Sequence, residues 1–433
     1  MWIAVLTFVI SYIAISTEKF PRHWASLLGG SMLILTGVLT PKDAMEYINW
    51  ETLGLLTGMF VLVSILSEAG FFTWLSMAAL KKVNFHPSYL FVILILLAAF
   101  LAMFMDSITV MLFLAALTLQ LCRLLKLNPV PIIIAEVCAA NTGGSATLVG
   151  DPPNVILGTT LGFSFSDFVT HTGPISVLAA LVLLVYFYFI NRKNLKAARV
   201  ALTPDVIKDI ETLHNEPVHA HLTRVGVIGF VSAVFLLVFH LPLSALSGLP
   251  INAATSALIP AALALMVLKE NHRKKVILKV DGESIMFFLG LFLLIGGLEK
   301  VKVFEIISTF IVAVSSSPNE MLVLLHWAPG VMSGIVDNVP LALAMSYVLK
   351  DLVGQPGVPP LALMVWSLAL GVDIGGNLTP IGASANVVAY SYMERSWGKI
   401  GWGRWLIIAV PPTLIVMVLA TGLLLLKGFY GWY

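Results

Sequence analysis

Long apolar runs recur along the whole chain, separated by short polar segments. Single runs of about 16 to 24 residues lie roughly at 2–17, 24–39, 51–69, 172–190, 225–240, 253–268, 283–299 and 405–426. About 20 apolar residues cross the hydrocarbon core as a helix, so these runs predict spanning helices and not barrel strands. The run from Trp2 to Thr17 is predicted to be the first span, because no basic flank precedes it and no small-residue cleavage site follows it.

Four longer apolar stretches fit no single helix. Those at about 88–126 and 320–350 each predict a pair of helices that form a hairpin, and those at about 129–162 and 361–390 are interrupted by Gly, Pro, Asn and Asp. The pattern predicts an all-α polytopic membrane protein with about ten transmembrane helices, two re-entrant hairpins and two broken helices.

Composition agrees with this class. The chain is 59% hydrophobic and 11% charged, and its mean hydropathy is +0.96, which excludes an ordinary soluble domain. Its two cysteines, Cys122 and Cys138, lie in apolar stretches. They support neither a disulfide framework nor a thiolate metal cage, so we expect no cofactor and no resident metal.

The chain contains an internal repeat that is visible in its letters. "NTGGSATLVGDPPNVI" aligns with "DIGGNLTPIGASANVV" at an offset of 232 residues, and "MDSITVML" aligns with "VDNVPLAL" at an offset of 231. The same offset of 232 relates Glu51 to Glu283 and Gly58 to Gly290. The alignment predicts two repeats, 1–190 and 225–433, joined by a polar connector at 191–224.

Charge placement indicates that the repeats are inverted in the bilayer. If the hairpins enter and leave on one face, each repeat has an odd number of crossings, so the repeats point in opposite directions. With both termini outside, twenty of the 25 basic residues lie inside, and the exceptions are Lys42, Lys300, Lys302, Lys350 and Lys427. This predicts an inner (plasma) membrane protein with a cytoplasmic connector. If both helices of each hairpin crossed the membrane fully, each repeat would gain two crossings and the number would stay odd. The charges therefore favour inverted repeats but do not show whether the hairpins are re-entrant.

The interrupted stretches are the candidate binding region. Inside hydrocarbon, a break with Gly-Gly and Pro-Pro is tolerated only where its backbone faces protein or a wet cavity. Unwound middles would leave half-helix ends that offer N–H groups and carbonyls near the midplane. A packing kink is the simpler reading of one such break, but a kink does not need Asn, Thr and Asp at matching positions of two repeats.

Four aspartates lie within apolar segments, where an ionisable side chain is costly and points to function. Asp106 and Asp337 could instead N-cap the second helix of each hairpin, with Ser107 or Asn338 assisting. Asp151 and Asp373 break the repeat symmetry, since Ala383 and Asn141 stand at the equivalent positions. This asymmetry suggests one specialised carboxylate in each break, which could carry a proton.

Neither the broken spans nor the hairpin tips contain Arg or Lys. A neutral polyhydroxyl solute or a small cation therefore suits these groups better than a tightly held polyanion. The candidate substrate- or ion-binding residues are Asp106, Ser107, Thr109, Asn141, Thr142, Gly143, Gly144, Ser145, Thr147, Asp151, Asn154, Asp337, Asn338, Asp373, Gly375, Gly376, Asn377, Thr379, Ser384 and Asn386.

At these motifs, with "VDNVP" and "IGGNLTPIGASAN", the sequence resembles the arsenite-permease and NhaD-type antiporter branch of the ion transporter superfamily. That branch also holds the melanosomal P protein and plant silicic-acid effluxers. The resemblance implies inverted repeats, a homodimer, and an elevator motion of hairpins and broken helices against scaffold helices. It also implies hairpin tips at 106–109 and 337–340, and unwound loops at 141–151 and 373–384.

The predicted function is secondary active transport, and not enzymatic activity. The resemblance favours proton-coupled efflux of arsenite or antimonite, with the hydroxyls read by Asn141, Thr142, Ser145, Thr147, Asn377 and Thr379. The alternative is a sodium/proton antiporter that uses the same aspartates. A pump with a separate ATPase subunit stays open, because the chain has no Walker motif of its own. An intramembrane hydrolase is disfavoured by the absence of H-E-x-x-H and G-x-S-x-G. Expected partners are the small solute, protons or sodium, and lipid, but no nucleic acid.

Overall fold

The computed structural model describes residues 1–16, 20–199, 203, 207 and 219–433, and the helices of the first repeat appear in the predicted order. These are α1 (Trp2–Ser16), α2 (Arg22–Leu35), α3 (Pro41–Tyr47), α4 (Trp50–Glu68), α5 (Phe71–Lys82), α6 (Pro87–Ala102), α7 (Ser107–Leu124), α8 (Val130–Gly144), α9 (Pro152–Leu161), α10 (Phe165–His171) and α11 (Gly173–Arg199).

The second repeat follows the same succession of hairpin and broken helix. Its elements are α13 (Ala220–Ser247), α14 (Ala253–Val267), α15 (Glu270–Lys279), α16 (Gly282–Lys300), α17 (Val303–Val314), α18 (Pro318–Ser333), α19 (Asn338–Leu352), α20 (Leu361–Gly375), the short 3-10 helix η1 (Gly376–Leu378), α21 (Ser384–Trp397) and α22 (Trp402–Tyr430). Within the described ranges no strand occurs.

The helices have the length and composition that a membrane requires. In the described part of the chain, 7 helices are long and apolar enough to span a bilayer, and shorter apolar helices of 10–17 residues accompany them. The predicted connector is partly helical, since α11 continues to Arg199 and α13 begins at Ala220. Residues 200–202, 204–206 and 208–218 of the connector lie outside the described residues, as do Lys19 and Lys208 of the charge count.

One group of helices packs reciprocally between the repeats. Helix α2 contacts α16, and α4 contacts α14. A Cβ on Gly58 would lie 2.6 Å from the backbone of Ala257, and one on the equivalent Gly290 would lie 2.4 Å from the backbone of Ser26 and Leu27. Small residues permit such close helix contacts in membranes. We call α2, α4, α13, α14 and α16 the scaffold group.

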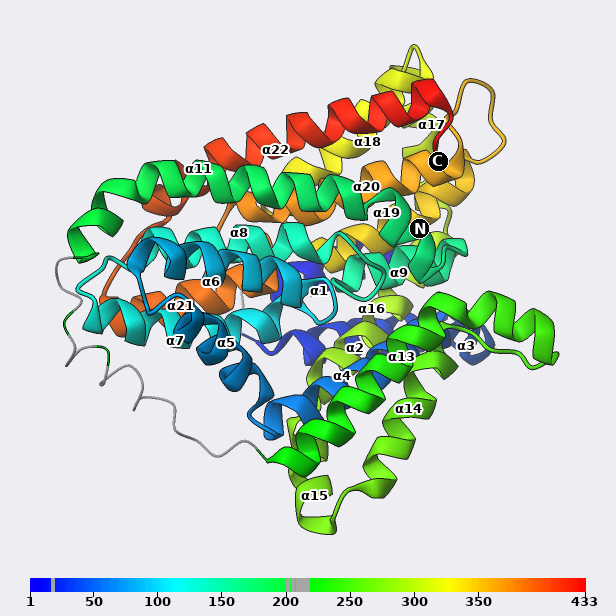
Figure 1. Ribbon diagram of the computed structural model, residues 1–433. Helices are drawn as coiled ribbons and strands as arrows, with labels where there is room; N and C mark the ends of the chain where they lie inside the picture. The colour runs from blue at the N-terminus through cyan, green and yellow to red at the C-terminus, as the bar shows by residue number, and fades with distance from the viewer. Residues whose placement is uncertain (17–19, 200–202, 204–206, 208–218) are drawn as a thin grey trace.

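The hairpins and broken helices form a second group. Helix α6 contacts α8, α18 contacts α20, and α11 and α22 pack on these and on each other. Figure 1 shows α8, α11, α20 and α22 running alongside one another, with the scaffold group below them and both chain ends toward the same end of the molecule. We call the hairpin helices α6, α7, α18 and α19, together with α8, α9, α20 and α21, the core group.

The predicted unwinding at Gly143 and Gly144 was wrong, and so was that at Asp373. Helix α8 continues through Gly144 and α20 through Gly375, so the breaks are the shorter segments 145–151 and 376–383. The reason is packing. A Cβ on Gly143 would lie 2.2 Å from the Ala99 carbonyl oxygen, and one on Gly375 would lie 2.0 Å from that of Gly330. These glycines allow α6 to pack closely against α8 and α18 against α20.

Candidate functional site

The hairpin tips are fixed by the predicted aspartate caps. The Asp106 carboxylate accepts hydrogen bonds from the Thr109 N–H at 2.9 Å and from the Thr109 hydroxyl at 2.8 Å. Asp337 accepts from the Val339 N–H at 3.0 Å and from the Ser384 hydroxyl at 3.2 Å. The capping hypothesis is therefore confirmed for both residues, and Asp337 also joins its hairpin to the second broken helix.

Asp151 is the point where the two hairpins meet. Its carboxylate accepts from the Ser107 hydroxyl of the first hairpin at 3.1 Å and from the Asn338 amide of the second at 3.0 Å. The residue is buried, with only 2% of its surface exposed. Ala383 stands at the equivalent position of the other repeat and cannot make these bonds. The asymmetric carboxylate thus ties segments from both repeats into one site.

Each break is closed by an equivalent asparagine. The Asn154 amide donates to the Gly144 and Thr147 carbonyls, both at 3.1 Å. The Asn386 amide donates to the Gly376 carbonyl at 2.8 Å and the Thr379 carbonyl at 2.7 Å. Carbonyls freed where a helix stops need partners when no water is present. These amides supply them, which explains an asparagine at both positions.

The threonines of the breaks fasten each hairpin to its own break. Thr147 donates to the Met103 carbonyl and Thr379 to the Gly334 carbonyl, again at equivalent places of the two repeats. Ser145 turns away from the other repeat, toward the Thr142 carbonyl at 2.7 Å and the Ser176 hydroxyl of α11 at 2.8 Å. The structure places these hydroxyls inside the protein packing.

The two broken helices contact each other through amides, next to their breaks. The Asn141 amide donates to the side-chain oxygens of Asn377 and Asn386, both at 2.9 Å, and the Asn377 amide lies 3.5 Å from the Thr142 hydroxyl. All four residues are fully buried. Trp405 of α22 covers the cluster and donates to the Asn377 carbonyl at 3.1 Å. Segments more than 200 residues apart in the sequence therefore share one polar interior.

Asp373 stands out within this interior. It is fully buried, and neither carboxyl oxygen has a hydrogen-bond partner among the described residues. The polar side chains that interact with it are those of Asp151 and Asn154. The Asn154 side-chain oxygen is also without a donor.

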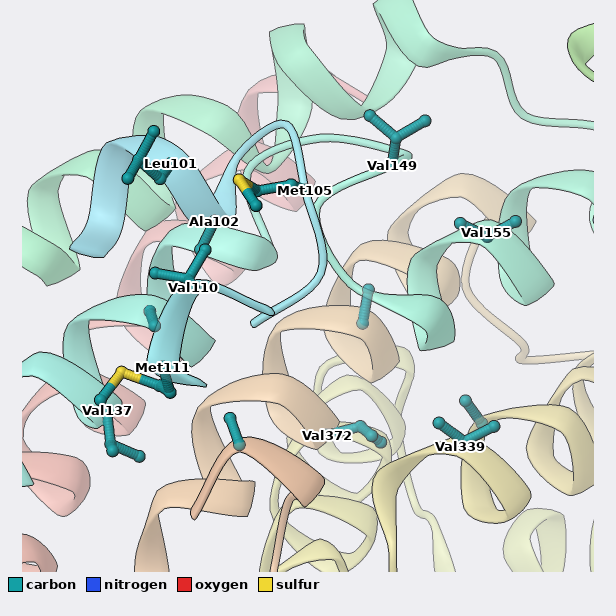
Figure 2. Close-up of a cluster of buried hydrophobic side chains, with 14 of the residues drawn as sticks. Leu101, Ala102, Met105, Val110, Met111, Val137, Val149, Val155, Val339 and Val372 are labelled. Atoms are coloured by element: carbon teal, nitrogen blue, oxygen red, sulfur yellow. The ribbon is translucent and has the colours of Figure 1, made fainter. Parts of the chain in front are cut away.

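The segments that carry these polar groups also contribute to a cluster of buried apolar side chains (Figure 2). These side chains come from the first hairpin, the first break and its helix α9, and from α19 and α20; the buried members include Met105, Val110, Val149, Val155, Val339 and Val372. The hydrogen bonds of the site therefore lie in a region of low polarity, where an unpaired polar group is costly.

Three adjoining cavities reach the site. The innermost, about 20 Å³, is lined by Asp106, Ser107, Asp151, Asn338 and Asp281 among others, and can hold about one water or small ion. A second of about 280 Å³ shares Arg22 and Ser384 with it and adds Asp337. A third of about 750 Å³ shares Phe60, Ile108 and Asp281 and extends beside Lys279 and Glu283.

Arg22 is the site residue that the sequence did not reveal. Its guanidinium donates to the Ser384 hydroxyl at 2.7 Å and to the Ser284 hydroxyl at 3.1 Å, and it lies 5.2 Å from the centre of the Phe287 ring. The expectation of a site without a nearby cation therefore needs correction, because α2 of the scaffold group supplies one. No motif marked Arg22, which stands among the other basic residues at a span boundary.

Two interlocked breaks, two hairpin tips and a cavity between helices are the features of a membrane transport protein, and sequence comparison agrees. The chain belongs to the family described as citrate transporter (CitMHS), whose profile matches residues 12–371 and 294–433.

Named relatives span nearly the whole chain. The chain is 30% identical to the "46 kDa membrane protein" of Mycobacterium leprae over 99% of this chain and 98% of that protein. It is 30% identical to the human "P protein" over 89% of this chain and 55% of that protein. The fold is similar to that of the Alcanivorax borkumensis YdaH transporter, with a TM-score of 0.58, 13% identity, and coverage of 93% of this chain and 88% of that one. The protein is a multi-pass membrane transporter.

Proposed function

We propose that this transporter exports a neutral metalloid hydroxide such as arsenite or antimonite in exchange for inward protons. The observation that carries the proposal is the position of Asp151 in the wall of the innermost cavity, bonded by one hydrogen-bond donor from each hairpin. That cavity holds about one water in the described conformation, so a larger solute would enter from the adjoining cavity of about 280 Å³. A solute that reached Asp151 would meet both hairpin tips at once, so its binding would be coupled to the position of both.

The charges of the cavities argue against a free tricarboxylate as the solute. Asp106, Asp151, Asp281 and Asp337 line the inner cavities, and Arg22 is the cation that faces them. Several carboxylates near one guanidinium repel a polyanion. A neutral hydroxide can instead donate to the carboxylates and accept from hydroxyls and amides such as those of Ser107, Asn338 and Ser384.

The transport cycle that we propose is an elevator motion of the core group against the scaffold group. In this proposal each chain contains two inverted repeats, and two chains form a homodimer in the inner membrane. Arg22 and Ser384 lie on opposite sides of that boundary. The side that carries Lys279 and Glu283 is predicted to be cytoplasmic from the charge pattern. The outermost cavity extends to that side, so the described conformation corresponds to the inward-facing state.

A sodium/proton antiporter is the second candidate. It is favoured by the same carboxylates and by an innermost cavity with space for one small ion. Carboxylate oxygens suit a hard cation as well as a proton.

Transport in proteoliposomes with an imposed pH gradient separates these candidates. We expect the gradient to drive arsenite movement in the opposite direction to protons, with no response to sodium. Proton movement that responds to sodium and not to arsenite would favour the antiporter. Uptake of citrate alone would contradict both, and Asp151→Asn is the matched variant that should reduce solute movement.

A further inference from the structure

The two asparagines that close the breaks have different partners, although their positions are equivalent. The Asn386 side-chain oxygen accepts a hydrogen bond of 2.9 Å from the Asn141 amide. The repeat offset of 232 residues relates Asn386 to Asn154 and Asn141 to Asp373. The group equivalent to the Asn141 donor is therefore a carboxyl group, which donates only when it carries a proton.

The surroundings of Asp373 offer it no donor. Both amide hydrogens of Asn154 are used, because its Nδ2 donates to the Gly144 and Thr147 carbonyls. The Asn154 oxygen and both Asp373 oxygens are buried without a donor. The remaining neighbour, Asp151, already accepts from Ser107 and Asn338. Hydrogen-bond acceptors that are buried among other acceptors, without a donor, raise the free energy of the folded protein. A proton held between two of the oxygens removes this cost.

No other charged side chain compensates Asp373. The elements packed against α20 contribute His326 of α18, whose Nδ1 bonds to the Ser367 carbonyl, and Glu136 of α8, which accepts from the Thr118 hydroxyl at 2.5 Å. Helix α19 contributes Asp337, which caps its own helix. Helix α22 carries Lys427, whose Nζ lies 3.0 Å from the His171 ring. Each of these groups bonds to a residue other than Asp373, and the second ring nitrogen of His326 and the second carboxyl oxygen of Glu136 are buried without a partner of their own.

We propose that Asp373 holds a proton that it shares with Asn154, and that this proton is the one exchanged during transport. The inference deepens the proposed function and rests on it for the exchange step. Asp151, and not Asp373, lines the innermost cavity. The O–H bond of Asp373 breaks when the proton passes by way of Asp151 to water in that cavity, which leaves a carboxylate beside the Asp151 carboxylate. Repulsion between the two charges then favours uptake of a new proton when the cavity opens to the other side.

Infrared spectroscopy of the purified transporter tests the protonation without any solute. Glu136 is also fully buried with one carboxyl oxygen that has no partner among the described residues, so two protonated groups can contribute. We expect a carbonyl band of protonated carboxyl groups near neutral pH, with one component that Asp373→Asn removes and a second that Glu136→Gln removes. Asp373→Asn restores the amide donor found in the other repeat, so it should fold and show an unchanged or higher melting temperature. The reciprocal variant Asn141→Asp faces only acceptors and should gain a further carboxyl component.

Proteoliposomes test the exchange step. In Asp373→Asn a pH gradient should no longer drive solute transport, whereas solute should still equilibrate down its own concentration gradient. An unchanged band in Asp373→Asn would overturn the proposal, and loss of the Asp373 component with intact coupling would overturn its exchange step. If that component disappears as expected but wild-type protein moves neither arsenite nor sodium, the proposed function fails and the assignment of the proton stands.

Discussion

The guanidinium of Arg22 donates a 2.7 Å hydrogen bond to the hydroxyl of Ser384, a residue 362 positions further along the chain. Arg22 begins α2 of the scaffold group, whereas Ser384 begins α21, the second half of a broken helix. Ser384 also donates to Asp337 at the second hairpin tip. One chain of polar contacts thus joins the group proposed to stay fixed to the group proposed to move.

Replacing Arg22 by Gln should destabilise the described conformation. Hydrogen bonds to charged groups contribute more than neutral ones. For a half-buried pair we expect a loss of about 1 kcal/mol, which lowers the equilibrium constant for the described conformation about fivefold. A cysteine at Ile108, which lines all three cavities, reports the population of this conformation by maleimide labelling, since Cys122 and Cys138 are buried. The labelling rate should fall, by at most about fivefold.

The matched control is Arg123→Gln. Arg123 also carries a guanidinium and donates to the Ser396 carbonyl at 3.0 Å, but it joins α7 to the segment of α21 within the core group. Its loss should leave labelling of the Ile108 cysteine unchanged. Equal changes in labelling for the two variants would show that the Arg22 hydrogen bonds do not hold the scaffold group and the core group together.

The sequence predicted the two aspartate caps and the approximate positions of the two breaks, because these depend on local chemistry within two matching motifs. It did not reveal the role of the glycines. Gly143 and Gly375 have ordinary helical backbone conformations, and in the described residues the glycines with positive φ lie elsewhere, for example Gly162 and Gly248. A glycine that allows close approach and one that ends a helix look alike in a sequence. Arg22 was missed because its partner lies on a distant segment.

Alanine at Gly143 or Gly375 should destabilise the core group. The added Cβ would lie 2.2 Å from the Ala99 oxygen in one case and 2.0 Å from the Gly330 oxygen in the other, and both obstacles are backbone. Overpacking of this kind costs about 1–3 kcal/mol. Thermal unfolding in detergent should show a lower melting temperature for both. Gly422→Ala is the control, because that Cβ would meet nothing within 4 Å.

The contact between the two broken helices predicts an energetic coupling between Asn141 of α8 and Asn386 of α21. Their buried hydrogen bond of 2.9 Å should give a coupling of about 1 kcal/mol in a double-mutant cycle with alanine, measured by denaturant unfolding. The pair Asn141 and Thr36 serves as the control, since the Thr36 hydroxyl bonds within α2 at 2.8 Å. Additive effects in the first cycle would mean that the repeats do not stabilise each other here.

Outside the predicted spans, Asp43 of α3 predicts how stability depends on pH. The Lys300 ammonium, with help from Thr40, holds the pKa of the Asp43 carboxyl well below its usual value of 3.8. A lowered pKa means that the stabilisation is present above the usual value and is lost as the pH falls through the folded value. Lys300→Met should therefore lower the melting temperature at pH 7, and the difference from wild type should shrink progressively below about pH 4.

Lys302→Met is the control. Lys302, the N-cap residue of α17, pairs with Glu305 of the same helix at 2.6 Å, and such an exposed pair contributes little. A difference for Lys300→Met that stays constant down to strongly acid pH would show that the ion pair does not link α3 to α16.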